Sequence, residues 1–341
     1  MQLTKFDSRS LFVCECGPGA HLHARGCMRC STRRNVLLLA ILPAATNGLS
    51  PSPSPTQILA VAKSAAMEAS ALISSRVGAA VVKTKSNTKD LLTEVDSECQ
   101  AIIARHILTA FPSGHALLGE EDVPPGKEAA VEVLEQQLSG DATYLWIVDP
   151  LDGTTNFVQG LPMCGVSIGV ARRRPGESTD CAEWELLAGV IADPFKDELF
   201  VASAGGGATL NGERLSVGSE RLGDAVVATG FAPNERCLRP MVRGISAVGA
   251  RARTVRMLGS AAIMLAWVAC GRLSAYFEAD LNAWDTAAGV LLVREAGGVV
   301  TDLRGDPFEI TTRPIIACNA VAHAELRDVL AEAGVTGLDD V

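Results

Sequence analysis

Aromatic residues, long hydrophobic runs and basic side chains are all scarce in this chain of 341 residues. Only 4% of the residues are aromatic, and the apolar run that begins at Asn35 holds about ten residues, whereas a membrane-spanning helix needs about 20. After position 54 the chain has 24 lysines and arginines against 37 aspartates and glutamates. Because nucleic acids are bound through clustered basic side chains, this balance argues against a large nucleic-acid interface.

The abundant residues describe an acidic, globular protein. Hydrophobic residues make up 48% and charged residues 20% of the chain, which excludes a disordered chain, a collagen-like chain and a small disulfide scaffold. The length suits one large domain or two ordinary ones. Acidic side chains gathered at one place would suit a cation site.

Residues 1–54 differ from the rest of the chain in charge, with a net +4 against −13. Arg33 and Arg34 precede the short apolar run, which ends in small residues, and together these are the parts of a cleaved targeting signal. We expect a plastid or other organelle leader at 1–54, cleaved or disordered, and a folded body at 55–341 with halves 55–215 and 216–341. A secretory signal, a membrane anchor and a wrong gene start are the alternatives, and the mature body is expected not to associate stably with membranes.

Ten cysteines fall into two groups. Cys14, Cys16, Cys27 and Cys30 form two close pairs in the leader, and such pairs can bind zinc, although C-x-C spacing is less usual than C-x2-C and the leader looks disposable. The other six are dispersed through the body, which predicts reduced, buried side chains and no disulfide framework. They are Cys99, Cys164, Cys181, Cys237, Cys270 and Cys318.

Hydrophobic periodicity predicts a mixed α and β body without internal repeats. In the first half it indicates helices at 56–77 and 94–111, a loop or hairpin at 83–90, a short apolar run at 116–118, strands at 144–148, 163–171 and 186–192, and hairpins across 198–215. In the second half it indicates strands at 225–229, 254–258, 275–278, 299–302 and 315–318, with helices at 259–270, 284–296 and 322–333. An antiparallel first half followed by strand–helix alternation favours a layered architecture.

The sequence WIVDPLDGTTNF, residues 146–157, is the most informative window. A buried strand leads to Asp149, Pro150 is expected to end that strand, and Asp152 follows in a turn. Two carboxylates held this close repel each other unless a cation lies between them. Gly153 and Thr154 then offer backbone N–H groups to an anion. The alternative is a plain Asp/Gly turn whose carboxylates cap backbone groups.

Two other acidic segments favour the metal interpretation. The sequence GEED, which contains Glu120, follows a short apolar run, and Asp285 stands at the start of a predicted helix in WDTAAG. Each has an ordinary explanation, a solvated loop for the first and a helix-dipole partner for the second. Their occurrence in this order with DPLDGT is far less probable by chance than any one of them.

These motifs together resemble those of the inositol monophosphatase family of magnesium-dependent, lithium-sensitive phosphomonoesterases. The similarity covers about residues 57–330 and includes DLLTEVD at 90–96, GEE at 119–121, DPLDGTTNF at 149–157, Glu278 and WDTAAG at 284–289. It is greatest to the plastid inositol-monophosphatase-like proteins. The resemblance implies an α+β fold, a layered α-β-α-β-α sandwich of the inositol monophosphatase and fructose-1,6-bisphosphatase type, and a homodimer.

The resemblance also implies roles for named residues in metal binding. Two or three Mg²⁺ ions would be held by oxygen ligands, as hard cations prefer. These ligands are the carboxylates of Glu120, Asp149, Asp152 and Asp285 and the backbone carbonyl of Leu151. A metal-activated water would attack the phosphate, oriented and deprotonated by Thr154 and Glu120. Asp96 would hold Thr154 in place, or else serve only as a helix cap.

The substrate contacts implied by the resemblance are less specific. Backbone N–H groups of Gly153 and Thr154 would bind the phosphate. Lys85 would lie on a loop near the phosphate, Glu278 would contact a substrate hydroxyl and Ala261 would offer a backbone contact to the polyol. Without the resemblance, Lys85 would be interpreted as solvent-exposed and Ala261 as helix packing.

Several other mechanisms are disfavoured by the sequence. His106, His115 and His323 lie outside all these motifs, and no Cys-x5-Arg loop is present, so phosphohistidine and cysteine chemistry are not expected. The glycine triplet at 205–207 follows a predicted strand but leads to another hairpin, which argues against a nucleotide-binding loop.

The substrate expected from the turn sequence is myo-inositol monophosphate. The phosphoadenosine phosphatases and many histidinol-phosphate phosphatases carry DGTK, whereas this chain has Thr155 after DGT. Histidinol phosphate, galactose 1-phosphate and fructose 1,6-bisphosphate remain alternative substrates, since FAPNERC after Gly230 departs from the animal enzymes near a substrate-contacting residue. A regulatory binding role without catalysis is the alternative of another class.

Overall fold

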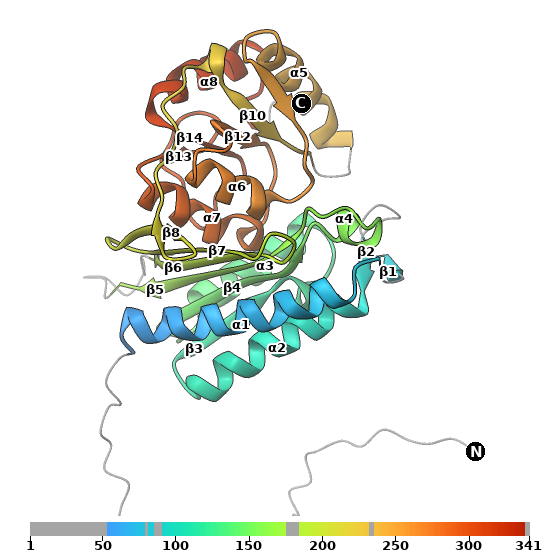
Figure 1. Cartoon of the computed structure of the whole chain (residues 1–341), viewed down its shortest axis with the longest axis vertical. Coiled ribbons are helices and arrows are strands. Elements are labelled where there is room, and N and C mark those ends of the chain that lie inside the picture. The colour runs from blue at the N-terminus through green and yellow to red at the C-terminus, as the bar shows by residue number, and fades with distance from the viewer. Residues whose placement is uncertain (1–52, 79–80, 85–90, 175–183, 232–234, 338–341) are drawn as a thin grey trace, which may run out of the picture. The chain divides into compact units, whose positions relative to one another are not determined.

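The computed structural model describes residues 53–78, 81–84, 91–174, 184–231 and 235–337. The described residues belong to one unit that starts at Ser52. They stack in five layers, in which two helices, a sheet, two helices, a second sheet and two helices follow one another (Figure 1). This is the α-β-α-β-α sandwich expected from the resemblance. The predicted leader, with its four cysteines, and Lys85 lie outside the described residues, so the proposed division at 54 stays a prediction.

Helices α1 (Pro55–Ser75) and α2 (Glu94–Ala110) form the first layer and confirm the two predicted N-terminal helices. Ser54 starts α1 with a capping box in which its backbone N–H donates to Gln57 Oε1 at 2.8 Å. By length and composition α1 could cross a membrane. In the fold, however, its apolar side packs against α2 and the first sheet, and its fully buried residues are Ile58, Ala62, Ala65, Ala66, Ala69 and Ile73.

The first sheet has seven strands in the order β3-β4-β5-β6-β7-β8-β9. Their bounds are β3 His115–Gly119, β4 Tyr144–Asp152, β5 Gly165–Arg173, β6 Trp184–Asp193, β7 Glu198–Ser203, β8 Gly207–Leu210 and β9 Glu213–Arg214. All neighbours are antiparallel except β3 and β4, which run parallel. The prediction of an antiparallel first half is therefore confirmed apart from β3. The last strand of this sheet ends just before the predicted boundary at 215.

The second sheet has five strands in the order β11-β10-β12-β14-β13 and is covered on its outer face by α5 (Glu235–Gly249) and α8 (Ala320–Glu332). Its strands are β10 Val226–Thr229, β11 Thr254–Arg256, β12 Ala275–Glu278, β13 Val299–Thr301 and β14 Ile315–Cys318. β10 is parallel to β11 and β12, whereas β14 is antiparallel to β12 and β13. All five strands match the predicted positions within a few residues.

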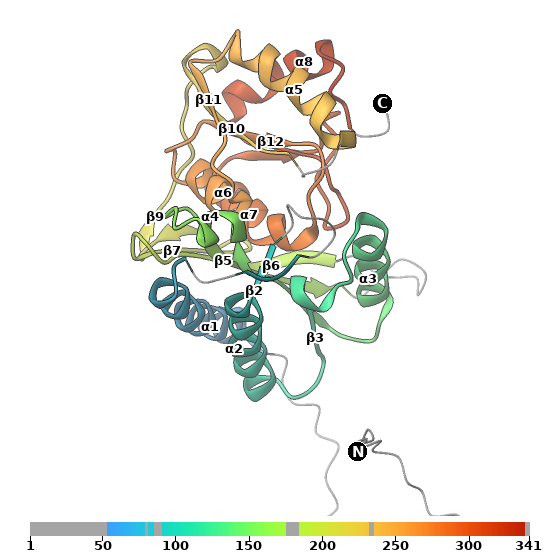
Figure 2. The ribbon, with the colours of Figure 1, turned by 90° about the vertical axis from the view of Figure 1, so that its right-hand side faces the viewer.

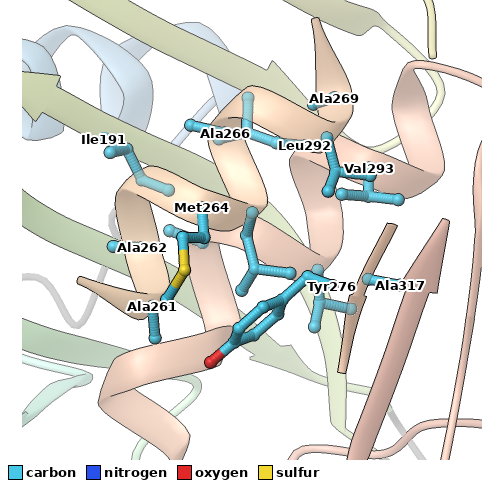
Figure 3. Packing of buried hydrophobic residues seen from close by; sticks show 14 of the residues in the cluster. Ile191, Ala261, Ala262, Met264, Ala266, Ala269, Tyr276, Leu292, Val293 and Ala317 are labelled. Atoms are coloured by element: carbon cyan, nitrogen blue, oxygen red, sulfur yellow. The ribbon is translucent and has the colours of Figure 1, made fainter. Parts of the chain in front are cut away.

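Helices α6 (Ala261–Ala269) and α7 (Ala283–Glu295) lie between the two sheets (Figure 2). They carry the apolar cluster shown in Figure 3, which joins α6 and α7 to Tyr276 of β12 and to Ile191 of β6. Glycines let α7 approach the first sheet closely. A Cβ atom added at Gly169 would lie 2.6 Å from Ala287 Cβ, and one at Gly189 would lie 2.7 Å from the Ala288 carbonyl oxygen. The small residues of WDTAAG are thus packing residues.

Two parts of the first half were not predicted correctly. The expectation that Pro150 ends its strand is wrong, because β4 continues to Asp152 with one extra residue relative to β5, between the pairs Asp149–Ser167 and Asp152–Gly165. Proline is compatible with a bulge, since it has no N–H to donate to the ladder. Helix α3 (Lys127–Ser139) was not expected at all.

The remaining elements are short or poorly marked in the sequence. A hairpin of β1 (Val81–Thr84) and β2 (Leu91–Thr93) precedes α2. The other short elements are η1 (Glu120–Asp122), α4 (Thr154–Val158) and η2 (Leu222–Asp224). Helix α5 was also missed, and it contains Pro240. The glycine triplet forms a turn whose Gly205 and Gly207 N–H groups both donate to the Glu295 carboxylate at 2.8 Å.

No disulfide joins the five described cysteines of the body. Cys99, Cys164, Cys237 and Cys318 are buried, and Cys270 is partly exposed. Cys181 lies outside the described residues. Burial raises the pKa of the Cys99 thiol to about 12, which keeps it protonated and unreactive.

His115 belongs to an aromatic stack at the N-terminal end of β4. Its ring stacks on Phe111 and Tyr144 with centroid separations of 4.2 and 4.6 Å, and its Nδ1 accepts a hydrogen bond of 2.9 Å from Trp146 Nε1. Burial lowers the pKa of His115 to about 4. Protonation at Nδ1 would remove the bond from Trp146, so the fold favours the neutral imidazole.

This stack predicts a pH-dependent stability difference between the wild type and His115→Gln. The unfolded His115 takes up a proton near pH 6.5 and the folded one near 4, so the wild type should lose free energy of unfolding relative to the variant as pH falls through that window. Urea denaturation at pH 7.5, 6, 5 and 4.5 measures the difference. Parallel pH profiles for the two proteins would contradict the prediction.

The close contact of α7 with the sheet predicts a loss of stability in Gly169→Ala. The added Cβ would overlap Ala287, and overpacking of this kind costs about 1–3 kcal/mol. Gly249→Ala is the matched control, since an added Cβ there meets only Val255 Cγ2 at 3.9 Å. Thermal and urea unfolding should separate the two variants, and equal stabilities would disprove the packing argument.

Candidate active site

Chain segments distant in sequence meet at a cavity of about 830 Å³. It is lined from η1, the end of β4, the start of α4, the start of α6, the end of β12 and the start of α7. Seven of the predicted site residues line it: Glu120, Asp152, Gly153, Thr154, Ala261, Glu278 and Asp285. The other three described ones do not line it: Asp149 and Leu151 precede Asp152 on β4, and Asp96 is hydrogen-bonded to Thr154. Lys85 is outside the described residues.

The bulge at the end of β4 places Asp149, Leu151 and Asp152. Asp149 is 2% exposed, and its Oδ1 accepts the Leu151 N–H at 3.0 Å. This bond is the backbone-capping turn considered as the alternative to a metal site. The bond and a role in metal binding are compatible, because a carboxylate oxygen has more than one lone pair.

Asp152 is held at the start of α6. Its Oδ2 accepts hydrogen bonds from Ser260 Oγ and from the Ala262 N–H, both at 2.6 Å. Ser260 is also the N-cap of α6 and accepts from the Ile263 N–H at 3.3 Å. These bonds fix the Asp152 carboxylate against the first turn of α6.

Asp285 is placed in the same way by α7. It is the third residue of the helix, and its Oδ2 accepts the Asn282 N–H at 2.7 Å. Its expected helix-capping role is therefore present together with a position on the cavity wall. Glu120 starts η1 directly after β3, where Gln100 Oε1 accepts the N–H of the next residue, Glu121, at 3.0 Å.

Asp96 supports Thr154 and also caps a helix. Thr154 Oγ1 lies 3.0 Å from Asp96 Oδ1 and 3.1 Å from the Leu151 carbonyl oxygen. The other carboxylate oxygen of Asp96 accepts the Thr93 N–H at 2.9 Å, which closes the capping box of α2. The two interpretations of Asp96, support for Thr154 and helix cap, are thus both satisfied by one side chain that is 1% exposed.

The substrate side of the cavity contains Gly153, Ala261 and Glu278. Gly153 has φ +93°, and a Cβ there would lie 2.9 Å from the Met163 carbonyl oxygen, so this turn requires glycine. Glu278 is 6% exposed at the end of β12 and accepts a hydrogen bond of 2.6 Å from Tyr276 Oη.

Comparisons with known proteins show the family to which the chain belongs. The model of the inositol monophosphatase family matches residues 54–334. The chain belongs to this family. It is 42% identical to inositol monophosphatase 2 of Solanum lycopersicum over 235 residues, 68% of this chain and 82% of that protein. It is 38% identical to Nus factor SuhB of Xylella fastidiosa over 254 residues, 72% of this chain and 83% of that protein.

A solved structure of the family has the same fold. Inositol monophosphatase from Anabaena (Nostoc) sp. PCC 7120 is 33% identical, with a TM-score of 0.65 over 81% of this chain and 96% of that chain. Family membership makes the protein a phosphoric monoester hydrolase of a generally metal-dependent kind.

The electrostatics of the cavity fit a hard cation. Burial and the nearby Glu120 raise the pKa of Asp152 to about 6. The pKa of Asp285 lies well above its ordinary value, because of burial and the charges of Glu120 and Asp152. These carboxylates oppose one another's ionisation, and a divalent cation with oxygen ligands would relieve that repulsion.

In the described residues, no three acidic, histidine or cysteine side chains already surround one ion position. The donors nevertheless suit magnesium, because this ion usually retains several water ligands and is bound by one or two carboxylates together with phosphate oxygens. The fit therefore rests on the kind and charge of the donors at this cavity.

Sequence reasoning missed the residues that hold the carboxylates. Ser260 stands next to the predicted Ala261 and at a helix N-cap, which was a usable signal. Tyr276 lies two residues before Glu278 on the same face of β12. Arg313 also lines the cavity; its Nε donates to Asp280 Oδ1 at 2.5 Å and its Nη1 to Asn282 Oδ1 at 2.8 Å. No local pattern connects Arg313 with these residues, which lie 33 and 31 positions away.

Mutual repulsion at the cavity predicts that Asp152→Asn is more stable than the wild type in EDTA. At pH 7 the folded state holds the Asp152 charge at a raised pKa, so removing it should increase the free energy of unfolding by about 1–3 kcal/mol. The advantage should shrink as pH falls below 6, where the wild-type carboxyl takes up a proton.

A matched control is Asp193→Asn. Asp193 is also buried, but its carboxylate is paired with Lys196 Nζ at 2.8 Å, so this variant should lose stability. Urea denaturation with and without Mg²⁺ tests both, and added Mg²⁺ should stabilise the wild type more than Asp152→Asn. A destabilised Asp152→Asn in EDTA would refute the repulsion argument.

Proposed function

We propose that this protein hydrolyses myo-inositol monophosphate to inositol and phosphate with Mg²⁺ as its cofactor. The observation that carries the proposal is the meeting of Glu120, Asp152, Asp285 and the Thr154–Asp96 pair at one cavity. The named relatives that are inositol monophosphatases support the same substrate. Histidinol phosphate and the sugar phosphates remain the alternative substrates.

Two or three Mg²⁺ ions would be held by four carboxylates and one backbone carbonyl, those of Glu120, Asp149, Asp152 and Asp285 and that of Leu151. The bound ions would lower the pKa of a water molecule and offset charge on the phosphate and on the leaving oxygen. Every other step belongs to the chain itself. Thr154 and Glu120 orient the attacking water, and Glu120 takes its proton.

The hydrogen bond to Asp96 limits the rotation of the Thr154 hydroxyl, so that this hydroxyl presents its oxygen to the water in one fixed orientation. The backbone N–H groups of Gly153 and Thr154 bind the phosphate and disperse the charge of the transition state. On the polyol side, Glu278 bonds a hydroxyl and Ala261 offers its backbone. Lys85, which lies outside the described residues, is proposed as a further contact to the phosphate on the resemblance alone.

Three further properties are proposed on the resemblance and on the plant relatives. The protein is a homodimer, it is inhibited by lithium, and residues 1–54 direct it to a plastid. Apart from its substrate and Mg²⁺ it needs no nucleic-acid partner and no stable membrane attachment.

A second function deserves a test because relatives of similar identity are named Nus factor SuhB. A purely regulatory role would need the fold and its surface but would not need turnover at the cavity. The experiment below therefore measures metal binding, stability and phosphate release together.

Asp149→Asn should lose phosphate release by at least about a hundredfold, because weakening even the supports of metal ligands costs about 10–100-fold. Malachite-green detection on inositol, histidinol, galactose and fructose phosphates with Mg²⁺ gives the activity, and isothermal titration calorimetry gives Mg²⁺ affinity. Lithium is added as a competitor of the metal-dependent reaction. Asp141→Asn, at an exposed position, is the control.

The possible outcomes separate the two functions. Wild-type release from inositol monophosphate with loss of both turnover and Mg²⁺ affinity in Asp149→Asn supports the proposal. If the wild type releases phosphate from none of the substrates, the enzymatic proposal fails. A variant that changes only its stability would make Asp149 a turn residue and not a ligand.

A further inference from the structure

Glu278 lines the cavity and is not among the proposed metal ligands. Its one described hydrogen-bond partner is Tyr276. Tyr276 Oη donates to Glu278 Oε2 at 2.6 Å, and both side chains are buried, at 0% and 6% exposure. The two residues stand two positions apart on β12 and so project to the same face of the sheet. The contact is therefore built into the strand.

Tyr276 is the donor in this contact. Burial and the adjacent Glu278 hold the pKa of its hydroxyl well above 10, so the proton stays on the tyrosine oxygen. A donor at Oε2 means that any proton taken up by Glu278 resides on Oε1. In either protonation state the tyrosine thus determines which carboxylate oxygen is left for other partners.

Gly230 lies next to the same carboxylate oxygen. A Cβ added at Gly230 would lie 2.6 Å from Glu278 Oε2 and 3.4 Å from Oε1. The residue directly follows β10, which is hydrogen-bonded to β12. The glycine therefore provides the space in which Oε2 meets the tyrosine hydroxyl.

Packing fixes the tyrosine in turn. Its ring lies within the apolar cluster of α6 and α7, and its hydroxyl points to the end of the cluster where Ala261 is labelled (Figure 3). Ala261 and Glu278 both line the cavity. A ring enclosed in this way has little rotational freedom, so the position of its oxygen is set by the core.

We propose that Tyr276 and Gly230 act through Glu278 to select substrates that carry a hydroxyl on the leaving group, by presenting Oε1 alone to the cavity. The inference rests on the proposed function. It makes Tyr276 a positioning residue and assigns substrate selectivity to a buried contact within β12. An ionised Oε1 accepts from a substrate hydroxyl, and a protonated one donates to a substrate oxygen.

Tyr276→Phe tests the inference because it removes one atom and keeps the ring. Freed of its donor, Glu278 can turn, and we expect the ratio of kcat/KM for myo-inositol 1-phosphate to that for 4-nitrophenyl phosphate to fall about tenfold. The second substrate has no hydroxyl on its leaving group. The fall should come from a higher KM for the inositol substrate with kcat little changed, since the contact concerns binding of the polyol.

The chain offers a closely matched control. Tyrosine occurs at only one other position, Tyr144, which is 4% exposed at the start of β4 and stacks on His115. Tyr144→Phe removes the same atom from a buried ring that does not line the cavity, so the selectivity ratio should not change. Gly230→Ala should change it in the same direction as Tyr276→Phe.

A double-variant cycle separates this mechanism from general damage. In a Glu278→Gln background, Tyr276→Phe should have no further effect on selectivity, because both substitutions remove the same oriented carboxylate. Additive effects, or an equal loss on both substrates, would overturn the inference. So would a Tyr276→Phe enzyme with unchanged selectivity.

Binding measurements keep the test independent of turnover. Titration calorimetry with Mg²⁺ present should show about tenfold weaker binding of myo-inositol 1-phosphate to Tyr276→Phe, with inorganic phosphate much less affected. If the wild type turns over neither substrate, the proposed function fails, and the binding comparison still decides the role of Tyr276. Equal affinities of wild type and variant for the inositol ester would contradict that role.

Discussion

Repulsion among buried carboxylates is the interaction on which the rest of this structure depends. Asp152 and Asp285 both line the cavity, and burial together with the charge of Glu120 raises the pKa of each. The charge of Asp152 raises the pKa of Asp285 further. A fold can retain such groups only if it holds them rigidly and if a cation or a proton offsets their charge. Here rigidity comes from bonds to the protein backbone and to Ser260 at the starts of two central helices.

The position of the central helices α6 and α7 is fixed by close packing against the sheets. Helices α6 and α7 can place Asp152 and Asp285 at one cavity only because they pack tightly between the two sheets. Gly169 and Gly189 remove the side chains that would hold α7 away from the first sheet. The motif WDTAAG thus combines Asp285, which lines the cavity, with small residues that allow α7 to pack closely against the first sheet.

Most of the fold was predictable because its elements carry local signals. The strand ending at Glu278, the strand 315–318 and the helix expected at 56–77 have clear periodicity, and the structure places them within two residues of these bounds. The cap of that helix is Ser54. Helix α3 was missed although Ala130, Leu134 and Leu138 follow helical spacing, because most of its residues are polar and its apolar side is narrow.

The residues of the site were predictable from the sequence, but the contacts that hold them in place were not. The motifs gave the residues that line the cavity, because ligand chemistry is encoded in short sequences. The continuation of β4 beyond Pro150 was not predictable from local rules, because the bulge exists only in relation to β5. Contacts such as Arg313 with Asp280 and Asn282 likewise depend on loops that meet only in the folded chain.

The two hydrogen bonds of Asp96 couple the first turn of α2 to Thr154. Since one carboxylate both closes the first turn of α2 and restrains Thr154, fraying of that turn would release the threonine while the sheets stay intact. If Thr154 orients the attacking water as proposed, local opening at residues 93–96 would inactivate the protein while the rest of it stays folded.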